Sequence, residues 1–119
     1  MRYATLRSQE FQSVEVSVVT LGGAAGGELA NVNRWRAQVG LAPLDEAALA
    51  KERLEVASEV GPIAVYDLTG KGEGGARMVA GLLNVPGGST WFFKLTGDAK
   101  TVDAVRPVFL RLLATVHRA

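Results

Sequence analysis

The sequence predicts an α+β domain: an antiparallel β-sheet flanked by helices on both faces. Three observations lead to this fold class. Short β-branched or aromatic runs recur along the chain, and turn-rich segments separate them. The strand-like runs of the C-terminal half carry apolar residues on both faces, which indicates a sheet that is covered on both sides. An amphipathic helix closes the chain. Because 119 residues have room for one core, a single domain over residues 1–119 is expected.

The N-terminal part begins with two predicted strands, Met1–Arg7 and Val14–Leu21. Valines alternate with polar residues at the start of the second strand, so one of its faces is apolar. The glycine-rich loop Gly22–Gly27 follows. A helix is predicted over Glu28–Val39, because this segment has no Gly or Pro and Gly40 follows it, with a proline shortly after.

A second, short helix is predicted over Glu46–Leu54, with Asp45 as its N-cap. Three strands joined by two turn-rich connections are expected after it, and they form an antiparallel meander: Ile63–Leu68, Arg77–Val85 and Thr90–Thr96.

The final helix ends near His117. Its apolar residues follow the i, i+3, i+4, i+7 pattern: Val102, Val105, Phe109, Leu112, Leu113 and Val116. Thr101 is the expected N-cap. Pro107 removes a backbone donor, so it is expected to bend this helix or to mark its true start.

Composition excludes several classes of function. The chain has 13 Lys plus Arg against 12 Asp plus Glu, and a net charge of +1 produces no field that would recruit nucleic acid. With no cysteine and a single histidine, His117, we predict no catalytic residue, no metal site and no cofactor. The longest uncharged stretch is broken by glycine and proline, so no membrane span is expected. A lipid tether outside this sequence is an open alternative.

Four residues of the first helix are the predicted ligand-binding residues: Asn31, Asn33, Trp35 and Arg36. Arg36 falls inside the apolar stripe of that helix, where a guanidinium must be paired or hydrogen-bonded. We favour a structural role, in which Arg36 bonds to a carboxylate or to loop carbonyls and fixes the helix on the sheet. The functional alternative is that it binds the carboxylate or phosphate of a ligand in a cleft.

Two other segments have weaker signals. The loop Gly22–Gly27 stands where a phosphate cradle would, but it lacks the Gly-x-Gly spacing and the lysine, and Glu28 would repel a phosphate. A plain connection is favoured over a ligand loop. The aromatic run Trp91–Phe93 is expected to be core rather than pocket lining. Lys94 shares the face of Phe92, as a solvated lysine or at a pocket rim.

The segment Thr90–Gly97, with the helix that follows it, resembles the C-terminal strand and helix of the PsbP-like α/β/α sandwich. That fold is shared by a photosystem II extrinsic protein, a Ran-binding nuclear import factor and bacterial lipoproteins. The segment Asn31–Arg36, with Gly40 and Leu41, resembles uncharacterised bacterial proteins of that group. The resemblance implies binding or assembly roles without catalysis. It also implies a periplasmic or cell-envelope location, with the cytoplasm as the alternative.

The leading hypothesis is therefore a non-catalytic binding or accessory module for an unknown protein or small ligand. It would use the surface around Asn33, Trp35 and Arg36. The alternative is a small-molecule-processing enzyme with a pocket between sheet and helices. A third hypothesis is a homodimer that buries an apolar helix or sheet face between copies.

Overall fold

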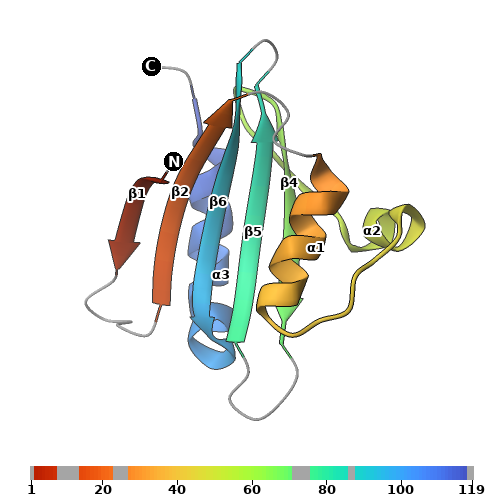
Figure 1. Cartoon of the computed structure of the whole chain (residues 1–119). Coiled ribbons are helices and arrows are strands. Elements are labelled where there is room, and N and C mark those ends of the chain that lie inside the picture. Colours follow the sequence, from red (N-terminus) through yellow and green to blue (C-terminus); the bar gives the residue numbers. More distant parts are fainter. Residues whose placement is uncertain (1, 8–13, 23–26, 71–75, 86–87, 118–119) are drawn as a thin grey trace.

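The computed structural model describes residues 2–7, 14–22, 27–70, 76–85 and 88–117. Within them, six strands form one antiparallel sheet in the order β1-β2-β6-β5-β4-β3 (Figure 1). The strands are β1 Arg2–Arg7, β2 Val14–Gly22, β3 Leu54–Ala57, β4 Pro62–Thr69, β5 Ala76–Asn84 and β6 Ser89–Asp98. The helices are α1 Glu28–Gln38, α2 Glu46–Glu52 and α3 Ala99–Ala114. The predicted α+β class is confirmed, and β4, β5 and β6 form the predicted meander.

The predicted stop signal at Gly40 and the predicted N-cap Asp45 are both confirmed. The N–H of Leu41 donates to the carbonyl of Arg36 at 2.8 Å, which is the 6→1 hydrogen bond of a Schellman motif. Gly40 takes φ +79° there, a conformation that costs a glycine little because it has no Cβ. At the start of α2, the Asp45 side chain accepts a hydrogen bond from the N–H of Ala48 at 2.8 Å. The last residue of α1 is Gln38, one residue before the predicted end.

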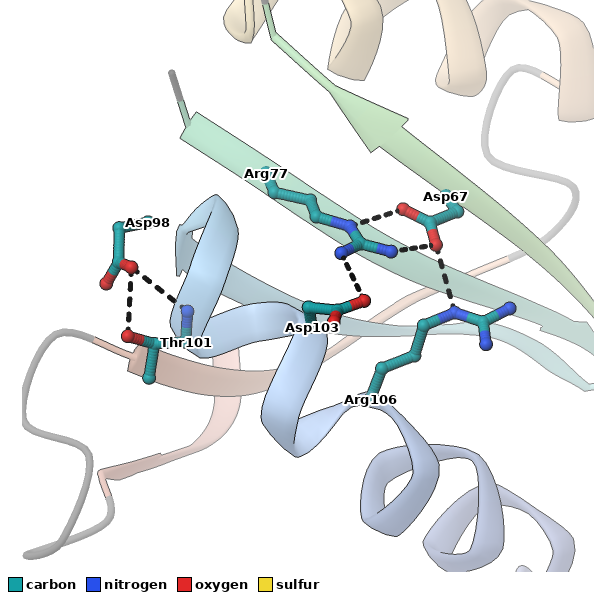
Figure 2. Close-up of polar contacts among 6 residues, drawn as sticks. All are labelled: Asp67, Arg77, Asp98, Thr101, Asp103 and Arg106. Carbon is teal, nitrogen blue, oxygen red and sulfur yellow. Dashed lines mark hydrogen bonds and ion pairs between the residues drawn. The ribbon is translucent and has the colours of Figure 1, made fainter. Parts of the chain in front are cut away.

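Two other boundaries were wrong. The helix predicted to reach Leu54 ends at Glu52, and the chain continues into β3, which pairs with β4. Strand pairing there overrides the helix propensity of the segment. Helix α3 has Asp98 as its N-cap, not Thr101. Asp98 Oδ1 accepts from both the N–H and the hydroxyl of Thr101, at 3.0 and 2.9 Å (Figure 2). Pro107 lies inside α3 and does not mark its start.

Alternate residues of the central strands enter two different core clusters, because successive side chains of a strand point to opposite faces. The first cluster combines Val32 and Trp35 of α1 and Leu49 of α2 with sheet residues: Ala64, Tyr66, Leu68, Met78, Ala80, Leu82 and Phe92. The second combines α3 with β2, β4, β5 and β6: Val102, Phe109, Leu113, Val14, Ile63, Val65, Val79, Leu83 and Leu95. In Figure 1, α1 and α3 lie on different sides of the sheet.

Candidate functional site

Two of the four predicted site residues hold the connection between α1 and α2. Asn33 Nδ2 donates to the carbonyl of Leu44 at 3.0 Å, and the N–H of Leu44 donates to Asn33 Oδ1 at 2.7 Å. Arg36 Nε donates to the carbonyl of Ala42 at 2.6 Å. Arg36 therefore bonds to a loop carbonyl, as expected if its role is structural. Together these bonds fix the loop that leads into α2.

The other two predicted residues lie on the buried face of α1. Asn31 is 1% exposed, and its Nδ2 donates to the carbonyl of Gly27 at 2.6 Å. Trp35 is 0% exposed and meets Phe92 edge-on, with ring centroids 5.8 Å apart. The Nζ of Lys94 lies 5.8 Å from the centre of the Trp35 ring, within cation–π range. Phe92 belongs to the core, as predicted. Lys94 contacts one of the four predicted residues, Trp35. Ligand binding by this group stays a prediction.

Tyr66 ties α1 to β4. Tyr66 is fully buried, and its hydroxyl donates to Oε2 of Glu28, the first residue of α1. Arg53 Nε donates to the same oxygen at 3.0 Å. Burial and the hydrogen bond to Glu28 raise the pKa of Tyr66 above its ordinary value. The fold therefore stabilises the protonated hydroxyl, which is the form that donates to Glu28 of α1.

Asp67, the next residue of β4, ties α3 to the sheet from the other face. Arg77 Nε and Nη2 donate to its two carboxylate oxygens at 2.8 and 2.6 Å (Figure 2). Arg106 Nε of α3 lies 2.9 Å from Asp67 Oδ2, as an ion pair without the geometry of a hydrogen bond. Arg77 Nη1 donates to Asp103 of α3 at 3.0 Å. We call these four residues the Asp67 cluster.

The Asp67 cluster attaches α3 to the sheet and has no net charge that would attract a charged ligand. Burial by itself would raise the pKa of Asp67, but the hydrogen bonds and charge of Arg77, with the charge of Arg106, lower it. The side chains of Asp67 and Arg77 are only 24% and 15% exposed, whereas that of Asp103 is 75% exposed. Two arginines and two aspartates cancel in formal charge. This cluster was not predicted from the sequence. The signal that could have indicated it is that Asp67 is the only charged residue in the strand run Ile63–Leu68.

Helix α3 exposes large apolar side chains on its solvent side, which no other helix in the described ranges does. Val108 and Leu112 are 55% and 52% exposed. They are four residues apart, so they are neighbours on the helix surface. The expectation that Leu112 belongs to the buried stripe was wrong. Phe109 and Leu113 take the positions against the sheet, and Leu112 is turned about 100° from Leu113. We call the surface formed by Ala104, Val108 and Leu112 the outer face of α3.

Other kinds of site find no support in the described ranges. No three His, Asp or Glu side chains gather there in a way that could hold a metal ion. None of the helices in those ranges has the length and apolar character that crossing a membrane requires. Comparison of the chain with protein-family models, with curated proteins and with solved structures finds no match. The resemblance to the PsbP-like group and the cell-envelope location stay predictions.

Proposed function

We propose that this protein is a non-catalytic binding module that docks a protein partner on the outer face of α3. The observation that carries the proposal is the exposure of Val108 and Leu112, 55% and 52%, on successive turns of one helix. The apolar stripe of an amphipathic helix is typically the side that packs against the core. Helix α3 buries Phe109 and Leu113 against the sheet and leaves this second apolar side to solvent.

The contacts that hold α3 on the sheet support a docking role. Val102, Phe109 and Leu113 are each no more than 2% exposed, so the helix is anchored along its length. The Asp67 cluster adds ion pairs from the sheet to α3 near its N-terminal half. A helix held in this way presents its outer face without reorganisation, which lowers the entropic cost of association.

Site-specific photo-crosslinking in the source cells tests this function. A photoreactive amino acid replaces Val108 or Leu112, and an exposed residue of α2, Ala50, serves as the matched control position. We expect the same protein adduct from positions 108 and 112 and none from position 50. Adducts that are the same at all three positions, or no adduct from α3, would contradict the proposed function.

A further inference from the structure

The charges beside the outer face of α3 point to the chemistry of its partner, and this inference rests on the proposed function. Lys100 and Arg111 are exposed. At about 100° per residue, Arg111 lies about 60° and Lys100 about 80° around the helix from Val108. Both basic side chains therefore border the apolar stripe.

Acidic side chains of α3 are turned away from this stripe. Within the described residues of α3, Asp103 is the one acidic side chain. By the same geometry it lies about 140° from Val108 and about 180° from Leu112. Its carboxylate bonds to Arg77 of the sheet at 3.0 Å. The outer face is consequently apolar along its centre and positive along one border.

We propose that the outer face of α3 binds an amphipathic helix that carries acidic residues beside its own apolar stripe. Apolar side chains at i and i+4 form a ridge that fits into a groove on the surface of a second helix. Glutamates or aspartates that border the partner's stripe would meet Lys100 and Arg111.

Two other occupants fit this surface less well. A second copy of the chain would bring the lysine and the arginine of both copies to one contact, and like charges brought together oppose association. A lipid surface favours helices with a broad apolar face that is rich in Trp, Phe and Leu. The outer face of α3 exposes two large apolar side chains, Val108 and Leu112. The described residues of α3 include one aromatic side chain, Phe109, and it is buried.

The test uses the full chain and two synthetic peptides with the same leucine stripe, one bordered by glutamates and the other by lysines. Amide chemical shifts of the ¹⁵N-labelled protein report where and how tightly each peptide binds. We expect the acidic peptide to shift amides of the outer face of α3 and to bind about fivefold more tightly than the basic one. This preference should vanish at 1 M salt, where the screening length is about 3 Å.

Charge-reversal variants complete the test. The double variant Lys100→Glu, Arg111→Glu should reverse the peptide preference. Lys51→Glu, at an exposed position of α2, is the matched control and should leave it unchanged. Equal binding of both peptides, or binding of neither, would overturn the inference, and the crosslinking at positions 108 and 112 decides the docking role separately. The same shifts produced by vesicles of phosphatidylcholine and phosphatidylglycerol, or by raising the protein concentration alone, would also overturn it.

Discussion

Replacing the central carboxylate of the Asp67 cluster, Asp67→Asn, should destabilise the fold by about 2–3 kcal/mol. The carboxylate accepts two hydrogen bonds from Arg77, at 2.8 and 2.6 Å, and pairs with Arg106 at 2.9 Å. Asparagine keeps the shape but has no charge, and its amide nitrogen opposes an arginine N–H. Removing one partner of a fully buried ion pair costs roughly 3–5 kcal/mol. Asp67 is 24% exposed, so water offsets part of that cost.

Asp103→Asn is the matched control, because Asp103 contacts the same guanidinium of Arg77 at 3.0 Å but is 75% exposed. It should cost no more than about 0.5 kcal/mol. Urea unfolding, followed by the fluorescence of the two tryptophans, Trp35 and Trp91, measures the free energy of unfolding of both variants. The reasoning is refuted if the two substitutions cost the same.

The cluster also predicts an acid dependence with a definite sign. The pKa of Asp67 is lower in the folded than in the unfolded chain, so its ionised form favours folding. This stabilisation is complete above the ordinary aspartate pKa, about 3.9, and is lost as the pH falls through the lower folded-state value. Urea midpoints measured across the acid range should fall less steeply for Asp67→Asn than for the unchanged protein.

Three further substitutions test the rest of the fold by urea unfolding. Asp45→Ala removes the N-cap of α2 and should cost about 1 kcal/mol; an unchanged midpoint would show that the cap is unimportant. In Gly70→Ala the new Cβ would lie 2.6 Å from the Val39 carbonyl oxygen, so a loss of about 2 kcal/mol is expected, and no loss would mean that this approach is looser. Because the fold raises the pKa of Tyr66, the protein should lose stability as the pH rises above about 10. Tyr66→Phe should reduce that alkaline loss, and an identical pH profile would contradict the assigned role of the hydroxyl.

The sequence predicts elements well where neighbours along the chain decide the backbone. Gly40 ends α1 and Asp45 begins α2 through bonds that span only a few residues. The prediction of apolar residues on both faces is likewise confirmed for β5, whose residues divide between the two core clusters. Strand β3 was missed because Leu54–Ala57 is extended only through its pairing with β4, a contact between segments that no local pattern encodes.

The candidate site was less predictable for the same reason. The sequence shows that Arg36 needs a partner, but the Ala42 carbonyl becomes that partner only when the loop after α1 folds back. Asp67, Arg77 and Arg106 come from three elements, and no spacing along the chain relates them. Helix α3 is apolar on two sides, so periodicity alone does not say that Leu113 faces the sheet and Leu112 faces solvent.

Thiol labelling of Val108→Cys tests most directly the claim that the outer face of α3 is free for a partner. The chain has no cysteine, so the introduced thiol is the only one to react. Ala50→Cys, at an exposed position of α2, provides the reference rate. We predict that a maleimide labels both variants at comparable rates and that neither rate depends on protein concentration. Strong protection of Val108→Cys relative to Ala50→Cys would contradict the claim, because the face would then already be covered by the chain itself or by a second copy.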